Sequence, residues 1–378
     1  MFVEIDNTPR DYAWGSRDAI ASLLGREASG GPEAEYWLGT HPGSPSVILD
    51  PATAGGATKL TELATLPFLL KVLAASAPLS LQAHPTPAQA RDGFARENAA
   101  GIALDAVDRN YKDAAHKPEL IYALSDDFTA LCGFRPVADT RRLLAPLAGD
   151  SAVDDLLRRL VDDSRLRDVF EWLITRGDGV DSLVARVVEL VSADDRGVPE
   201  FQLVPRLAAA YPGDPGIVIA LLLNLVALAP GEVLYLPAGN IHAYLGGLGI
   251  ELMAASDNVL RGGLTPKHVD VPELLTVLDF RPLPVPYLVP SHPSAGVSVF
   301  KPDVPDFELV VIEPGPAGAE FSPTGESILL CTDGTVKVVG ADGTAELARG
   351  QSVFVTADEP PMRFTGAGRV FLAASRTV

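Results

Sequence analysis

Four side chains of types that commonly bind metals stand out in three short motifs. They are Gln82 and His84 in LQAHP (81–85), Glu119 in HKPEL (116–120) and His242 in PAGNIHAY (237–244). Gln82 and His84 are two residues apart, so in an extended strand both point to the same face. Two imidazoles and two oxygen donors suit one divalent cation, and zinc is the expected ion.

The sequence around these residues favours a shared site over isolated polar side chains. SLQAHP (80–85) places two polar side chains on one face of an otherwise apolar strand, where burying them unpaired would cost free energy. Glu119 comes directly before an apolar run, and His242 follows a Pro-Ala-Gly turn. The alternatives are a core histidine at His84, a solvated strand entry at Glu119 and a surface loop at His242.

The densest group of charged residues lies in GIELMAASDNVLRGGLTPK (249–267). Its polar members alternate with apolar residues, unlike a solvated run; they are Glu251, Asp257, Asn258, Arg261 and Lys267. Gly262 and Gly263 let the backbone approach a ligand closely. Arg261 offers a planar fork for a carboxylate, a phosphate or an enediolate oxygen. The alternative is a structural ion pair between Arg261 and Asp257, which are four residues apart.

Neighbouring residues extend this set toward an anionic ligand. Ser80, with the Arg and Lys side chains, could hold a phosphate, and Lys117 could meet an anionic or enolate-like group. Three further histidines have no comparable context and are interpreted as structural or surface residues; these are His41, His268 and His292. Cys132 and Cys331 have no adjacent His or Lys, so a nucleophilic role is not predicted.

Length and charge restrict the function further. The chain has 378 residues, which indicates two or three domains, and its net charge is −19. Such a surface repels phosphate backbones and anionic lipids, so neither nucleic acid nor a membrane is an expected partner. An anionic substrate would therefore need a locally basic pocket. Two distant cysteines and an N-terminus without a signal-peptide pattern favour the cytoplasm.

The hydrophobic pattern divides the chain into β-rich and helical parts. Short apolar runs bounded by Pro, Gly and Asp predict strands at 46–50, 68–75, 79–83 and 120–124, with helices near 16–24 and 87–98. Helical spacing then predicts several helices over 137–229, where the apolar run 217–229 reads as a buried core helix.

The rest of the chain returns to the β pattern. Strands are predicted over 232–238, 241–245 and 249–254, a helix over 268–280 and a proline-rich linker over 281–290. Six alternating runs follow over 295–378. The expected fold is mainly β, with two sandwiches or barrels and helices inserted into the first.

These motifs together resemble the type I mannose-6-phosphate isomerases. The segments that carry the resemblance are DYAWGS (11–16), AEYWLGTHPGSPS (34–46), LPFLLKVLAASAPLSLQAHPTPAQA (66–90), HKPEL (116–120), FTALCGFRP (128–136) and LPAGNIHAYLGGLGIELMAASDNVLRGGLTPK (236–267). The helical block and the C-terminal region match mainly in layout. Ala115 departs from the family, which often has Asn there, but it touches no expected ligand.

The resemblance implies an architecture and a division of the chain. It implies two cupin-type jelly-roll β-barrels plus an all-α block. The expected parts are a split catalytic barrel (1–136 and 230–267), a helical insertion (137–229), a helix and linker (268–290) and a C-terminal cupin-like barrel (291–378).

The resemblance also implies residue roles. It implies one zinc ion per chain, with other divalent metals possible, on residues matching Gln82, His84, Glu119 and His242. An active-site arginine of the family matches Arg261. The two lysines and the serine of its motifs match Lys117, Lys267 and Ser80. A monomer acting on a small sugar phosphate is expected.

The chemistry of aldose–ketose interconversion assigns tasks to these groups. A proton must move between C1 and C2, so the developing enediolate must be stabilised by a cation and by Arg261. Candidates for the base are Glu251, Asp257 and Lys117, and the sequence does not choose among them. Lys267 and Ser80 are expected to contact phosphate. His116 is also expected to bind the substrate, and either His116 or a metal-bound water could assist ring opening.

Three other functions are compatible with parts of this pattern. A cupin oxygenase would use mostly histidine ligands on iron, which the Gln, Glu and cationic residues argue against. A non-catalytic sugar-phosphate sensor would have lost a ligand or Arg261, and neither is lost. An isomerase with a different preferred sugar phosphate fits the motifs equally well.

Overall fold

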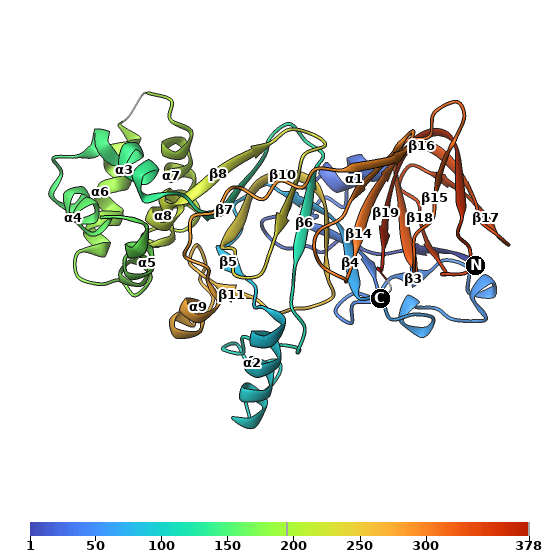
Figure 1. The fold of residues 1–378 in the computed structure, drawn as a ribbon, viewed down its shortest axis with the longest axis horizontal. Coiled ribbons are helices and arrows are strands. Elements are labelled where there is room, and N and C mark those ends of the chain that lie inside the picture. The colour runs from blue at the N-terminus through green and yellow to red at the C-terminus, as the bar shows by residue number, and fades with distance from the viewer. Residues whose placement is uncertain (194–195, 377–378) are drawn as a thin grey trace.

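The protein is mainly β, with a group of helices at one end, as seen in a computed structural model that describes residues 1–193 and 196–376 (Figure 1). The helices α3–α8 lie at one end, and the C-terminal strands lie at the other with both chain termini. The strands that carry the candidate site lie between them. Within the described residues, no helix is long and apolar enough to cross a membrane.

The central sheet carries the candidate ligands. Within the described residues it has nine strands: β2 (Glu35–Gly39), β4 (Phe68–Ala75), β5 (Gln82–Ala83), β6 (Glu119–Ala123), β7 (Phe128–Phe134), β8 (Leu223–Leu228), β9 (Val233–Leu236), β10 (His242–Ala254) and β11 (Leu260–Arg261). Strand β10 organises the sheet because its first half pairs with β5 and β7 and its second half with β4 and β6. One strand therefore runs from His242 to Glu251 and beyond.

The second sheet is built mostly from the C-terminal region. In the described part of the chain it has ten strands: β1 (Phe2–Asp6), β3 (Val47–Ile48), β12 (Ser291–Ser294), β13 (Val297–Phe300), β14 (Glu308–Ile312), β15 (Ala319–Phe321), β16 (Ser327–Val339), β17 (Thr344–Ala348), β18 (Ser352–Val355) and β19 (Met362–Ala374). Strand β1 pairs with β18 and β3 pairs with β1, so the N-terminal segment lies in this sheet.

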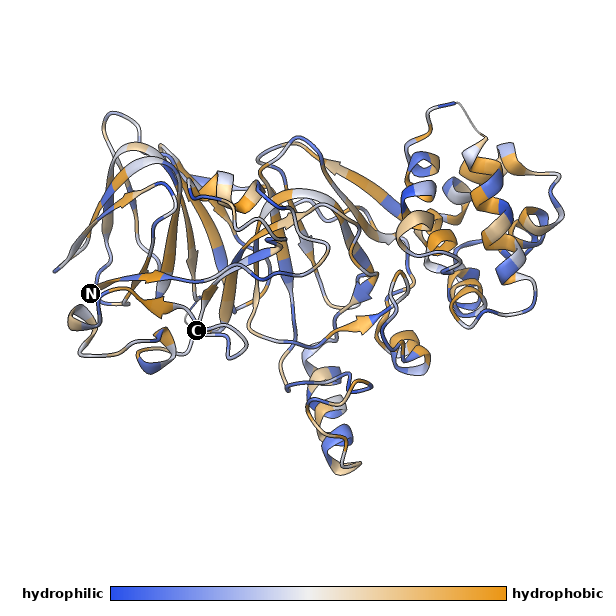
Figure 2. Cartoon of the chain, turned by 180° about the vertical axis from the view of Figure 1, so that it is seen from behind, coloured by the Kyte–Doolittle hydropathy of each residue, from blue (hydrophilic) through white to orange (hydrophobic). Residues whose placement is uncertain are grey.

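Three large apolar cores lie in the described β part, whose strands are coloured largely as hydrophobic in Figure 2. One lies within the central sheet and includes Ile121 and Tyr244, and a second fills the C-terminal sheet around Val336 and Phe364. A third joins the two sheets, where Tyr122 packs edge-on against Phe300 and Phe371. Because this third core is continuous, burial of apolar surface fixes the two sheets against each other.

Three α-helices of the described residues lie outside the α3–α8 group. They are α1 (Ala19–Leu24), α2 (Pro87–Ala99) and α9 (Val271–Val277). The start of α2 follows the predicted pattern, with a proline at its first turn. Thr86 accepts a hydrogen bond from Gln89 N, and the Gln89 side chain accepts one from Thr86 N in return.

The helical group has its own amphipathic packing. It comprises α3 (Val137–Leu144), α4 (Ser151–Arg159), α5 (Leu166–Ile174), α6 (Val180–Ser192), α7 (Pro199–Ala210) and α8 (Gly216–Ile219). Their buried faces form one core with residues from the end of the central sheet, among them Leu81 and Ile241. The prediction of amphipathic helices is confirmed here: Val153 and Leu156 of α4 and Leu183, Val184 and Val187 of α6 are buried at helical spacing.

The prediction of one buried helix over 217–229 is wrong. Helix α8 ends at Ile219, a 3₁₀ turn covers Ala220–Leu222, and the remainder is strand β8. Strand β8 pairs with β7, and Asn224 Nδ2 donates to the carbonyls of residues 132, 133 and 134 at 3.0, 3.2 and 3.3 Å. A continuous apolar run shows neither the helical nor the strand periodicity, so its sequence does not distinguish the two. Pairing with β7 makes the second half a strand.

We predict that Asn224→Asp lowers the free energy of unfolding by about 1–3 kcal/mol, because a carboxylate would face three carbonyl oxygens with no proton to donate. Urea unfolding followed by far-UV circular dichroism measures the change. Gln202→Glu, at an exposed position of α7, adds the same charge and should leave stability nearly unchanged. Equal stability of the Asn224 variant and the wild type would contradict this role.

Candidate functional site

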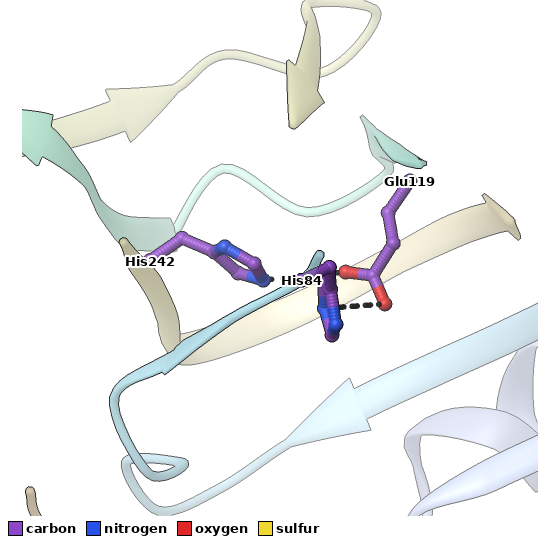
Figure 3. A group of neighbouring side chains, drawn as sticks. All are labelled: His84, Glu119 and His242. Atoms are coloured by element: carbon purple, nitrogen blue, oxygen red, sulfur yellow. Dashed lines mark ion pairs between the residues drawn. The ribbon is translucent and has the colours of Figure 1, made fainter. Parts of the chain in front are cut away.

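Three of the four predicted ligands converge inside the central sheet (Figure 3). His84 follows β5, Glu119 begins β6 and His242 begins β10, and one ligand atom from each lies within 4.8 Å of the others. His84 Nε2 is 3.2 Å from Glu119 Oε1, and His242 Nε2 is 3.3 Å from Glu119 Oε2. All three side chains are buried, so the group faces inward rather than to solvent.

Hydrogen bonding within this group is incomplete. His84 Nε2 and Glu119 Oε2 are buried without a hydrogen-bond partner, because the short distances to their neighbours lack hydrogen-bond geometry. Leaving such atoms unpaired in a protein interior is costly. A divalent cation between them would satisfy both, and the donor set of imidazole nitrogens and carboxylate oxygens suits zinc. The residues therefore fit a metal.

Backbone carbonyls fix which ring nitrogen of each histidine faces the cluster. His84 Nδ1 lies 2.7 Å from Asn258 O, and His242 Nδ1 lies 3.0 Å from Asn240 O. A carbonyl can only accept, so Nδ1 carries the proton in both rings. Both Nε2 atoms then keep a free lone pair, which is the form a metal binds.

Strand register places Gln82 and Arg261 beside the cluster. Gln82 in β5 is directly opposite His242 on one side and Arg261 on the other. Directly opposite residues share one face of a sheet, so all three point the same way. The Gln82 amide lies 3.4 Å from His242 Nε2. Since its oxygen and nitrogen can exchange places by rotation, Gln82 can offer an oxygen to the same cation.

Burial and neighbouring charges prepare the ligands for a cation. Burial lowers the pKa of His84 to about 4, so the imidazole is neutral at neutral pH. Glu119 is also buried, which opposes its ionisation, but Lys117 and the two histidines hold its pKa well below the ordinary value. Lys117 Nζ lies 3.1 Å from Glu119 Oε1. Glu119 is thus a buried but ionised carboxylate.

Two cations near the site have no carboxylate partner. Within residues 1–193 and 196–376, Arg261 and Lys267 form no ion pair, and the alternative pair of Arg261 with Asp257 is absent. Burial lowers the pKa of Arg261, and burial followed by the charge of Arg261 lowers that of Lys267. Ser80 is half-buried. The next residue, Leu81, donates its backbone N–H to Gly263 O. These groups form a cationic edge in an acidic chain.

Two other predicted residues are held by ion pairs. Asp257 Oδ2 lies 3.2 Å from the buried His41 Nε2, and this contact lowers the Asp257 pKa. The interpretation of His41 as a structural residue is consistent with its burial, but its pairing with Asp257 was not foreseen. His116 Nε2 lies 2.9 Å from Asp306 Oδ2, which precedes β14. The structure therefore places His116 against the C-terminal sheet.

A buried ion network next to Glu119 was missed by the sequence analysis. Lys71 Nζ lies 2.8 Å from Glu251 Oε2 and 3.5 Å from Glu35 Oε1, and Glu35 accepts a hydrogen bond from Trp37 Nε1 at 2.9 Å. Burial opposes the charge of Lys71, but Glu251, Glu35 and Glu119 together raise its pKa. Burial, with a smaller contribution from the charge of Glu119, raises the pKa of Glu251 although Lys71 opposes it.

One signal in the sequence could have revealed this network. Lys71 is the single charged residue in FLLKVLAA, and a lysine in a fully apolar strand needs a buried partner. Nearby, the hydroxyl of Tyr244 is buried without a hydrogen-bond partner, and burial raises its pKa strongly. The thiol of Cys132 also shares this interior, and burial raises its pKa to about 12, which agrees with the absence of a nucleophilic role.

The chain is similar to mannose-6-phosphate isomerases along nearly its whole length. Residues 2–137 match the family model of the phosphomannose isomerase type I catalytic domain. The chain is 36% identical to mannose-6-phosphate isomerase of Escherichia coli, over 96% of this chain and 97% of that protein. It is 34% identical to that of Homo sapiens, over 93% and 92%.

Solved structures of phosphomannose isomerases are similar to this chain over its full length. A crystal structure of mannose 6-phosphate isomerase bound with zinc and yttrium superposes with a TM-score of 0.88 at 36% identity and covers 100% of both chains. A mutant of phosphomannose isomerase from Salmonella typhimurium superposes with a TM-score of 0.90 at 35% identity, also over 100% of both chains.

We predict that the metal-free protein loses stability as the pH falls from 6.5 toward 4. The unfolded chain protonates His84 near 6.5, whereas the folded chain resists until about 4, so over this range the unfolded state binds more protons. The contribution is roughly 3 kcal/mol.

Urea unfolding of chelator-treated protein at pH 7 and 4.5 measures this loss. His84→Gln removes the titrating group and should flatten the pH dependence by about 2–3 kcal/mol. His268→Gln, at an exposed histidine, should leave the dependence intact. An unchanged slope in the His84 variant would show that another group causes the loss.

Proposed function

The chain belongs to the type I phosphomannose isomerases, and from this premise we propose that it interconverts mannose 6-phosphate and fructose 6-phosphate with one zinc ion. The observation that carries the proposal is the buried group of His84, Glu119 and His242, with two unpaired ligand atoms. Arg261 and Lys267, which form no ion pair within the described residues, would supply the local positive charge that an anionic sugar needs in a chain of net charge −19.

We assign the metal to His84, Glu119 and His242, with Gln82 as the fourth ligand. When bound, zinc supplies a Lewis acid that polarises sugar oxygens and stabilises negative charge on them. Lys117 stays beside Glu119 and keeps that carboxylate ionised. The Asn258 and Asn240 carbonyls keep both imidazoles in the tautomer that presents Nε2.

Among the three candidates for the base, the geometry favours Glu251. Asp257 is held by His41 with a lowered pKa, and Lys117 is held by Glu119. Burial raises the pKa of Glu251, so this carboxyl takes up a proton more readily than an exposed glutamate, which suits a group that gains and then returns a proton. Lys71, paired with Glu251, would keep it in place and balance its charge.

The proton transfer can be written with these groups. The Glu251 carboxylate removes the proton from C2 of the open-chain aldose, and the C–H electron pair forms the C1–C2 double bond of an enediolate. The carbonyl π electrons move onto O1, where Arg261 donates charge-assisted hydrogen bonds. The same carboxyl then returns the proton to C1, and the proton of O2 passes to O1, which gives the ketose. No redox cofactor is consumed.

The remaining assignments concern binding of the substrate. Lys267 and Ser80 are proposed to contact the phosphate, because they lie on the segments that flank Arg261 and Leu81. His116 is proposed to lie at the edge of the substrate site, next in sequence to Lys117. The contact of His116 with Asp306 would keep the imidazole in place through the C-terminal part of the chain.

We also propose that the two sheets form cupin-type jelly-roll barrels. Separate inward-facing cores around Ile121 and around Val336 support two closed β units. The division proposed is a catalytic barrel from 1–136 and 230–267, a helical insertion (137–229), a helix and linker (268–290) and a C-terminal barrel (291–378). Strands β1 and β3 cross from the first part into the second sheet.

A coupled assay tests the function directly. Conversion of mannose 6-phosphate to fructose 6-phosphate should be rapid, should stop after treatment with a chelator and should return on addition of zinc. Absence of conversion by zinc-loaded protein, with conversion of another hexose or pentose phosphate, would change the substrate. Absence of all isomerisation would overturn the proposal.

We predict that Glu119→Gln and His242→Ala each lose metal and activity together. Each change removes a ligand and leaves the other buried groups without a cation. Zinc content after gel filtration and turnover in the coupled assay are the measurements. His268→Ala is the control, because this exposed histidine lies outside the cluster. Full zinc content with full turnover in either ligand variant would remove that residue from the site.

We predict that Arg261→Ala keeps zinc but lowers kcat by about 10²–10³-fold, because it removes charge stabilisation that grows in the transition state. The measurements are zinc content, kcat and KM. Arg142→Ala, at an exposed residue of α3, is the control and should match the wild type. A raised KM with unchanged kcat would make Arg261 a uniform binding group instead.

A further inference from the structure

We infer that Asn258 is a positioning residue of the metal site, which it holds together from two sides without touching the ion. The inference rests on the metal site of the proposed function. Asn258 lies in the loop between β10 and β11, and its side chain is fully buried. Its backbone carbonyl faces one metal ligand, and its carboxamide faces the segment that leads to another.

The backbone of Asn258 determines the orientation of His84. Its carbonyl oxygen accepts the proton of His84 Nδ1 at 2.7 Å, and its N–H donates to Ser256 Oγ at 3.3 Å. Rotation of the peptide would therefore break both contacts. With Nδ1 engaged, His84 Nε2 points at Glu119. A shift of this one carbonyl would release the imidazole to the other tautomer or to another ring angle.

The side chain of Asn258 holds the residues before HKPEL. Its Oδ1 accepts hydrogen bonds from the N–H groups of Lys112 and Asp113 at 2.7 and 3.2 Å. Its Nδ2 donates to Asp113 O at 2.9 Å and to Ala115 O at 2.8 Å. Donors and acceptors on both sides match in only one orientation of the amide. Segment 112–115 is thus locked to Asn258, and Lys117 and Glu119 follow it directly.

Neighbouring residues make this connection rigid. Ser256 Oγ donates to Asp113 Oδ1 at 2.9 Å, and Asp257 N donates to Asp113 Oδ2 at 2.9 Å. The carboxylate of Asp113 is therefore shared between three consecutive residues, 256–258, since Asn258 Nδ2 also lies 3.3 Å from it. His84 and Glu119 are 35 residues apart in sequence, and Asn258 connects both to one buried network.

A change at Asn258 should weaken metal binding more than it weakens the fold. Asn258→Asp keeps the shape but places an oxygen against Asp113 O, Ala115 O and the Asp113 carboxylate, so segment 112–115 must move. The expected loss of zinc affinity is about 10–100-fold, the range for residues that orient metal ligands. Asn258→Ser, which is smaller and uncharged, should lose about 10-fold if the aspartate variant does not fold.

Chelator competition with zinc alone measures the dissociation constant of purified full-length protein, and far-UV circular dichroism confirms that each variant is folded. Asn224→Asp is the matched control, because Asn224 Nδ2 also donates to three oxygens of a neighbouring segment, all of them backbone carbonyls. It should lower the unfolding temperature and change zinc affinity less than about 2-fold. In ¹⁵N spectra of zinc-free protein, His84 should show a single Nδ1–H tautomer in the wild type and a mixture in the Asn258 variants.

The outcomes separate the two proposals. Zinc binding by the wild type with an unchanged dissociation constant in folded Asn258 variants would overturn the positioning role and leave the proposed function intact. An equal loss in Asn224→Asp would overturn it as well, because the effect would then follow from destabilisation in general. Failure of the wild type to bind zinc would overturn the metal site itself.

Discussion

The buried, ionised carboxylate of Glu119 in the central sheet is the constraint on which the site depends. An isolated buried charge of this kind is costly, and it persists only where cations and hydrogen-bond donors surround it. Lys117 supplies one cation at 3.1 Å, and the two imidazoles leave room for a second. One oxygen of Glu119 has no hydrogen-bond partner, so in the metal-free protein part of its negative charge is buried without compensation. A bound cation would compensate this charge, and this gain in free energy favours metal binding.

Strand β10 converts this local constraint into an active site. Its first residue is the ligand His242, and its tenth is Glu251, so the proposed base is fixed relative to the metal by one continuous strand. Strands β5 and β11 then extend the same face from His242 through Gln82 to Arg261. Gln82, His242, Glu251 and Arg261 thus lie on paired strands, and His84 directly follows β5. Rigid strands suit the proposed reaction, which needs accurate placement of a small substrate.

The balance of charge explains how an acidic protein can accept an acidic substrate. Several carboxylates near the site have a basic side chain beside them: Glu35 and Glu251 share Lys71, Asp257 contacts His41, and Asp306 contacts His116. Arg261 and Lys267 remain unpaired within the described residues. The second sheet contributes to this arrangement through Asp306 and through the apolar core that it shares with the first. This sheet therefore packs against the part of the chain that carries His116.

The sequence by itself determined the chemistry and most of the elements. The ligand types in LQAHP, HKPEL and PAGNIHAY, the cations of the segment 249–267 and the alternation of strands were all readable, because residue type and local period are local properties. The tertiary structure decided the rest. It made 223–228 a strand, brought Lys71 to Glu251 and placed Asn258 between His84 and segment 112–115. Each of these depends on pairing between residues far apart in sequence, and the free energy of such pairing depends on burial and register that no local pattern encodes.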